Sequence, residues 1–114
     1  MNQTCAAVTP EVDEFELAGL TPVDSQLIGV PRVLESPVSF ECRCTQIVQL
    51  QGANGEKVPT WLVLGEVVAV HIAQTLLKDG IYDTAGAAHV LRGGGPADYF
   101  ALGPDQLFKM RRPA

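Results

Sequence analysis

The chain has 114 residues, 46% of them hydrophobic, which fits one globular domain with a core of its own. Thirteen acidic residues against eight basic ones give a net charge of −5, and basic residues gather only near the end, at Lys109, Arg111 and Arg112. Nucleic acids and anionic membranes are disfavoured as partners, because both require a concentrated positive surface. We therefore expect a single domain over residues 1–114 with neither kind of partner.

The longest apolar tract, residues 61–73, is interrupted by a glycine, a glutamate and a histidine. It is shorter than the roughly 20 residues that a membrane span requires. The N-terminus has no basic start followed by an apolar block, as a secretory signal would have. Cys5, Cys42 and Cys44 are odd in number, and the last two lie too close together to form a disulfide comfortably. These features predict a cytoplasmic protein with reduced thiols.

The first half of the chain predicts a short helix and an interrupted strand. The acidic segment 11–19 is typical of a helix that ends at its glycine, Gly19. Residues 25–33 predict a strand, and Gly29 and Pro31 within it indicate an edge or a bend.

The middle of the chain predicts a long β-hairpin. Apolar Val38, Phe40, Cys42 and Cys44 alternate with polar Ser39, Glu41, Arg43 and Thr45, the period of a strand with one covered face. Residues 52–55 predict a tight turn, since Asn54-Gly55 supplies the positive φ angles that it needs. Residues 60–72 predict the returning strand. It is apolar on both faces, as expected where one face meets a barrel interior and the other meets a helix or a second subunit.

The last third of the chain predicts short elements. They are a turn at 76–80, a short helix at 84–91, a glycine-rich loop at 92–96, and strands at 99–102 and 106–110. The whole pattern is mainly β with short helices. It contains fewer strands than the roughly six that close a barrel, so the sheet is expected to be incomplete.

Five stretches of the sequence, in this order and spacing, match a known family pattern. They are VDEF with AGL in residues 12–20, ESPV with FEC in residues 35–42, GEVV with VHI in residues 65–72, DG with Asp83 in residues 79–83, and Arg92, Gly94, Gly95 and Tyr99 followed by MRRP in residues 110–113. In this respect the chain resembles the flavin reductase-like proteins of the FMN-binding split-barrel superfamily. The resemblance implies an antiparallel split β-barrel, of which residues 1–114 form the C-terminal portion without the N-terminal strands.

The resemblance also implies a function. It points to an FMN-binding oxidoreductase of flavin reductase type, or its C-terminal part, which transfers a hydride from NAD(P)H to flavin. Members of the family are commonly homodimers with FMN near the subunit interface. The alternative is a non-catalytic, dimerising split-barrel remnant without bound flavin. No residue is singled out as catalytic.

Three residues are candidates for cofactor binding. His71 matches a family position near the flavin; otherwise it is a satisfied histidine near a strand end. Arg92, beside three glycines, suits a phosphate, although a plain glycine-rich surface loop is the preferred interpretation. Tyr99 is placed either to stack on a flavin ring or to fill a core.

Neither a metal site nor tight FMN binding is expected of the isolated chain. Cys42 and Cys44 have no second ligand pair at metal-like spacing, so we interpret them as small core residues. Only the loop 92–96 resembles a phosphate cradle, and a lone basic residue provides little affinity. FMN binding is therefore expected to be weak or absent, and to depend on assembly with a second chain.

Overall fold

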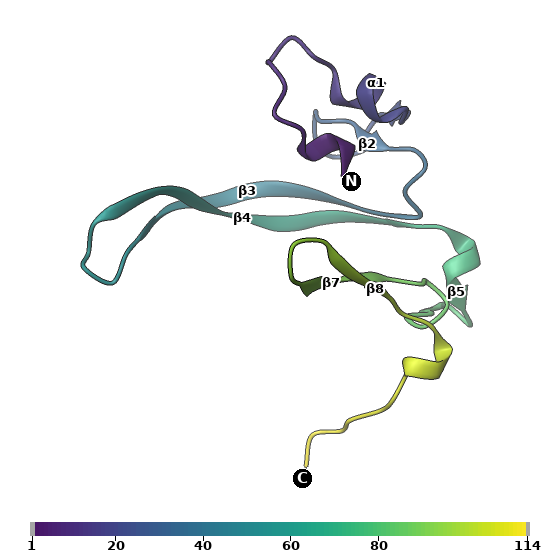
Figure 1. Cartoon of the computed structure of the whole chain (residues 1–114). Helices are drawn as coiled ribbons and strands as arrows, with labels where there is room; N and C mark the ends of the chain where they lie inside the picture. Colours follow the sequence, from purple (N-terminus) through teal and green to yellow (C-terminus); the bar gives the residue numbers. More distant parts are fainter. Residues whose placement is uncertain (1, 114) are drawn as a thin grey trace. The chain divides into compact units, whose positions relative to one another are not determined.

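The computed structural model describes residues 2–113, and the chain divides into two compact units, Met1–His71 and Ile72–Ala114. Strands dominate both units. In the described residues they form four antiparallel or hairpin pairs, each a sheet of two strands (Figure 1). The fold class is therefore mainly β with few helices, as the sequence predicts. No helix in this part of the chain is long and apolar enough to cross a membrane.

The first unit begins with two short helical segments. A 3-10 turn, η1 (Gln3–Cys5), precedes the helix α1 (Glu14–Ala18). The Asp13 carboxylate accepts a hydrogen bond of 2.8 Å from the backbone N–H of Phe15 and so caps the helix. Gly19 ends it with a left-handed φ of 64°. The predicted helix over residues 11–19 is confirmed, in a shorter form.

The predicted strand over residues 25–33 is wrong for most of its length. Only its end is extended, where β2 (Arg32–Val33) pairs antiparallel with β1 (Pro22–Val23). Residues 24–31 form an irregular loop, the 24–31 loop. The loop does not extend as a strand because the backbone N–H groups of Gln26 and Leu27 are bound by the side chain of Glu41, not by a neighbouring strand.

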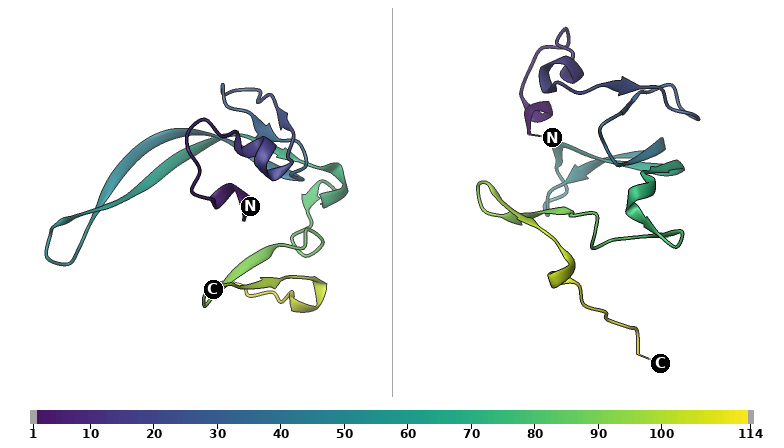
Figure 2. Two further views of the ribbon diagram at one scale, coloured as in Figure 1. Left: turned by 45° about the horizontal axis from the view of Figure 1, so that its top comes forward. Right: turned by 90° about the vertical axis from the view of Figure 1, so that its right-hand side faces the viewer.

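A long hairpin of β3 (Val38–Gln51) and β4 (Lys57–Ile72) forms the rest of the first unit. The two strands run side by side and curve together along their length (Figures 1 and 2). The Gly52 N–H donates to the Glu56 carbonyl over 2.8 Å, and Gly55 has a φ of 82°, so the predicted Asn-Gly turn is confirmed. The return strand is confirmed and begins three residues earlier than predicted.

The one buried side chain of β3 is not on the face that the alternation predicts to be covered. Among the described residues no apolar side chain is buried, and Phe40 is 60% exposed. Glu41, on the polar face, is the most enclosed side chain at 1% exposure. Cys42 and Cys44 are exposed free thiols, so their interpretation as core residues is wrong. Glu41 is buried because two backbone N–H groups of the 24–31 loop bind its carboxylate on the polar face of the strand.

The second unit starts with small turns. After η2 (Gln74–Leu76), β5 (Leu77–Lys78) pairs antiparallel with β6 (Ile81–Tyr82). The predicted helix over residues 84–91 is wrong. A single turn forms there, in which the Asp83 carbonyl and carboxylate accept the N–H groups of Ala87 and Gly86. Ala88 then takes a positive φ of 49°, which leaves the helical region and ends the turn.

The second unit ends with another hairpin, β7 (Val90–Gly94) and β8 (Asp98–Ala101). The predicted loop over residues 92–96 is wrong in its first half, because Arg92 pairs with Tyr99 and a register shift follows before Gly94. The predicted strand over residues 99–102 is confirmed as β8. The predicted strand over residues 106–110 is wrong: η3 (Pro104–Gln106) stands at its start, and no strand forms after it in the described residues.

Candidate functional site

The Glu41 side chain binds three hydrogen-bond donors from two separate parts of the first unit. Its Oε1 accepts from the backbone N–H of Gln26 over 2.7 Å and lies 2.6 Å from His71 Nε2. Its Oε2 accepts from the backbone N–H of Leu27 over 2.7 Å. We call Glu41, His71 and these two N–H groups the Glu41 cluster. It joins the start of β3, the end of β4 and the 24–31 loop.

The hydrogen bonds of this cluster keep the carboxylate charged. The Gln26 N–H bond acts most strongly, and burial of the carboxyl group opposes it by favouring the neutral form. The Leu27 N–H and His71 add to the Gln26 bond, and the pKa of Glu41 falls to about 2. Glu41 is therefore an ionised acceptor near neutral pH, with no proton to donate.

His71 is the predicted cofactor residue that this cluster contains. It lies near the end of β4, is 20% exposed, and directs Nε2 at Glu41. Among the described residues no other group hydrogen-bonds the ring, so its second nitrogen, Nδ1, has no protein partner there. Glu66, the other polar residue in the apolar run, is exposed. Strand β4 therefore carries both a largely covered imidazole, that of His71, and an exposed carboxylate, that of Glu66.

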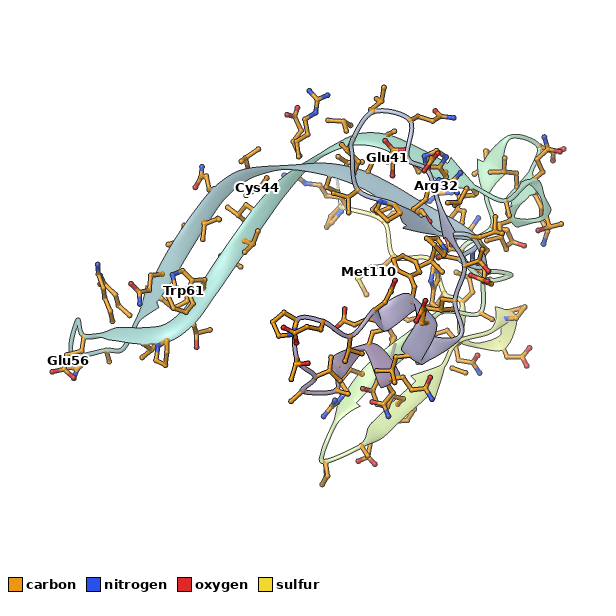
Figure 3. All side chains as sticks on the ribbon, turned by 90° about the horizontal axis from the view of Figure 1, so that it is seen from above. Arg32, Glu41, Cys44, Glu56, Trp61 and Met110 are labelled. Atoms are coloured by element: carbon orange, nitrogen blue, oxygen red, sulfur yellow. The ribbon has the colours of Figure 1, made fainter. Side chains whose placement is uncertain are left out.

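A second tie holds the 24–31 loop on the polar face of β3. Arg43 Nη2 donates to the Leu27 carbonyl over 3.1 Å, while Glu41 accepts the N–H of the same residue. An open groove of about 450 Å³ lies along this loop and includes Arg32, Ser36 and Phe40 in its lining. Arg32 and Glu41 are labelled at the same end of the hairpin in Figure 3, and Trp61 and Glu56 lie toward its turn.

The other two predicted cofactor residues meet in the second unit. Arg92 Nη1 donates to the Tyr99 hydroxyl over 3.1 Å, and the guanidinium carbon lies 5.2 Å from the centre of the tyrosine ring. Arg92 Nη2 donates to the carbonyls of Gly95 and Pro96 over 3.0 and 3.4 Å. We call this the Arg92 cluster. Its guanidinium braces the hairpin to which it belongs.

The glycines beside Arg92 are required by the hairpin itself. A Cβ atom on Gly93 would overlap the Phe100 ring, and one on Gly95 would overlap the Asp98 carboxylate. Gly94 takes a φ of 89°, which only glycine adopts easily. The Asp98 carboxylate beside Gly95 also repels a phosphate. The loop, in the conformation described, does not fit a phosphate cradle.

The structure thus pairs Arg92 with Tyr99, and His71 with a residue that the sequence did not single out. One feature of the sequence could have identified Glu41 as a partner of His71. In an antiparallel hairpin, counting outward from the turn at residues 52–56 brings the start of β3 beside the end of β4. An acid and an imidazole at these ends are therefore candidates to meet. Among residues 2–113 no three metal-ligating side chains gather in one place.

Comparisons with known proteins agree with this architecture. The model of the family described as "Flavin reductase like domain" matches residues 1–91. An uncharacterised protein of Halalkalibacterium halodurans is 34% identical over 113 residues, which are 99% of this chain and 52% of that protein. Nitrilotriacetate monooxygenase component B from Bacillus cereus has a similar structure, with a TM-score of 0.82 and 33% identity over 96% of this chain and 52% of that one.

A split barrel protein from Shewanella frigidimarina, assigned as a flavin reductase, is also similar. Its TM-score is 0.75, with 26% identity over 98% of this chain and 53% of that one. The fold of this chain therefore matches part of a split barrel, as the resemblance implies. The chain spans about half the length of these relatives.

Proposed function

Because the chain belongs to the flavin reductase-like domain family, we propose that it forms part of a flavin-dependent oxidoreductase that transfers a hydride from NAD(P)H to FMN. The observation that carries this proposal is the family match over residues 1–91, which includes the whole Glu41 cluster. The exposed free thiols of Cys42 and Cys44 support a cytoplasmic location for the protein.

In this proposal the flavin, when bound, supplies the redox chemistry by accepting the hydride. The chain supplies orientation. His71, fixed through Nε2 by Glu41, offers the other ring nitrogen to a flavin or nicotinamide group. Tyr99 presents an exposed ring. Arg92 reaches a phosphate only by giving up its bonds to Tyr99 and the Gly95 and Pro96 carbonyls.

We further propose that a second copy of the chain covers the long hairpin. Strand β4 carries a run of large exposed apolar side chains: Trp61, Leu62, Val63, Leu64, Val67 and Val70. Exposed apolar surface of this extent is typical of association sites. Sedimentation should show a dimer or larger assembly at micromolar concentration. Val63→Glu should weaken it, whereas Ile81→Glu, at an exposed apolar position outside the hairpin, should not.

Flavin titration tests the proposed activity. FMN fluorescence should be quenched weakly by dilute chain and more strongly at concentrations where it assembles. His71→Ala should reduce this quenching at least severalfold, and His89→Ala, the matched control at the only other histidine, should not. Tight stoichiometric quenching that is unchanged in His71→Ala and Arg92→Ala would refute both the weak binding and the residue assignment.

One observation favours the alternative, a non-catalytic dimerising remnant without flavin. The Arg92 guanidinium is bound within its own hairpin, so its loop does not offer a ready phosphate site. Purified assembly that is colourless and takes up no added FMN would favour this alternative. Assembly that oxidises NAD(P)H in the presence of FMN would favour the oxidoreductase.

A further inference from the structure

Glu41 is the most enclosed side chain of the described residues, and it is a carboxylate. An ionised carboxyl group out of water is stable only when donors surround it. Here two backbone N–H groups and an imidazole do so, at 2.6–2.7 Å. The position of the imidazole is therefore tied to that of the carboxylate.

The short contact also decides which ring nitrogen carries the proton. Since the pKa of Glu41 is about 2, its oxygens only accept hydrogen bonds near neutral pH. A nitrogen 2.6 Å from such an oxygen must be a donor, so His71 Nε2 is protonated. In the neutral ring, Nδ1 then carries the lone pair. The network, not an observed hydrogen atom, assigns this tautomer.

We propose that Glu41 is the positioning residue of His71, and that it holds the ring in the Nε2–H tautomer so that Nδ1 is the nitrogen offered to a ligand. The identity of that ligand, a flavin or nicotinamide group, rests on the proposed function. The same carboxylate also binds the N–H groups of Gln26 and Leu27. The orientation of His71 and the conformation of the 24–31 loop are thereby coupled through one side chain.

The coupling extends beyond a single contact. Arg43, two residues after Glu41 on the same face of β3, binds the Leu27 carbonyl. The loop is therefore held through both the backbone N–H and the backbone carbonyl of Leu27. A substitution that moves the Glu41 carboxylate is expected to disturb both the 24–31 loop and the His71 ring. A substitution of a different carboxylate that binds backbone N–H groups is not expected to do so.

Glu35 provides the matched control. Both of its carboxylate oxygens accept from the backbone N–H of Thr21, at 3.0 and 3.1 Å, and no histidine is among its partners in the described residues. Glu35→Gln thus removes a carboxylate that holds backbone but leaves His71 alone. His89, whose Nε2 lies 3.2 Å from the Tyr82 hydroxyl, is the internal reference in the same spectra.

Long-range ¹H–¹⁵N correlation spectra of the full chain, labelled at histidine and free of flavin, test this proposal. In neutral wild-type His71, Nε2 should give a pyrrole-like signal and Nδ1 a pyridine-like one. Glu41→Gln, whose amide both donates and accepts, should shift the His71 signals toward a tautomer mixture, and Glu41→Asp should restore part of the preference. Glu35→Gln should leave the His71 pattern unchanged.

Two results overturn the proposal: an Nδ1–H tautomer in the wild type, or a His71 pattern that is the same in folded Glu41→Gln. Should Glu41→Gln not fold, the wild-type spectrum and Glu41→Asp still decide it. Because the spectra need no flavin, they separate the two proposals. If His71 is the Nε2–H tautomer but the chain takes up no FMN, only the proposed function is refuted. If the chain takes up FMN but His71 is the Nδ1–H tautomer, only the positioning role of Glu41 is refuted.

Discussion

The Glu41 cluster and the Arg92 cluster differ in how far along the chain their partners lie. Glu41 binds groups 14, 15 and 30 residues away and is almost wholly enclosed. Arg92 binds groups three, four and seven residues away and is exposed. A long-range enclosed acceptor organises tertiary structure, whereas a local exposed brace supports one hairpin and is screened by solvent.

Glu41→Ala gives the largest expected loss of stability. The substitution leaves the N–H groups of Gln26 and Leu27 without their acceptor and releases His71. The midpoint of urea unfolding should fall clearly, and the Gln26 and Leu27 amides should exchange faster. Glu35→Ala, at an exposed carboxylate, should have a smaller effect. Equal losses in the two variants would contradict the claim that the enclosed carboxylate stabilises the chain more than an exposed one does.

Acid should weaken the Glu41 cluster next most strongly. The pKa of Glu41 is lowered in the folded chain to about 2, from an ordinary value of 4.5. A lowered pKa means that the stabilisation is fully present above about pH 4.5 and is lost as the pH falls through about 2. The amide shifts of Gln26 and Leu27 should titrate in this window. In Glu41→Gln they should stay flat there.

The turn glycines should behave alike in the two hairpins. Gly55 and Gly94 have φ angles of 82° and 89°, and a Cβ atom would meet nothing within 4 Å at either position. Alanine at either site should therefore cost about 1 kcal/mol through backbone strain alone. Gly29→Ala, without a positive φ and with equal space, should cost much less. Chemical unfolding of the three variants measures this.

Arg92→Ala gives the smallest expected effect. An exposed cation over an aromatic ring contributes about 0.5–1 kcal/mol, so the second hairpin should loosen only slightly. Tyr99→Phe removes the hydroxyl that accepts from Arg92 and keeps the ring, which separates the two contributions. Thermal melting provides the comparison. A loss as large as that of Glu41→Ala would show that this cluster is more than a local brace.

Local signals in the sequence predicted the elements whose causes are local. The turn at Asn54-Gly55 follows from residues that accept positive φ, and the strands on either side follow from their apolar pattern. The short helix ends at Gly19 for the same kind of reason. The predictions at residues 84–91 and 106–110 were wrong because the short mixtures of polar and apolar residues there match neither a helical nor a strand period strongly. At residues 84–91, hydrogen bonds to Asp83 form a turn where a helix was predicted.

Site prediction met a different limit. The family pattern led to His71, Arg92 and Tyr99, and the last two do meet across one hairpin. Their roles toward a cofactor stay predictions. Glu41 was missed because a glutamate on the polar side of an alternating strand is most simply a solvated residue. Alternation shows which residues share a face, but it does not show which face another segment covers.

By itself, therefore, the sequence determined the mainly β class, the long hairpin and the family, because periodicity, turn chemistry and motif order are properties of neighbouring residues. Only the tertiary structure decided that Glu41, on the polar face of β3, is buried, and that it meets His71, 30 residues later in the chain. The physical reason is that a buried charge requires donors, and these come from a loop whose approach to the strand no local pattern encodes.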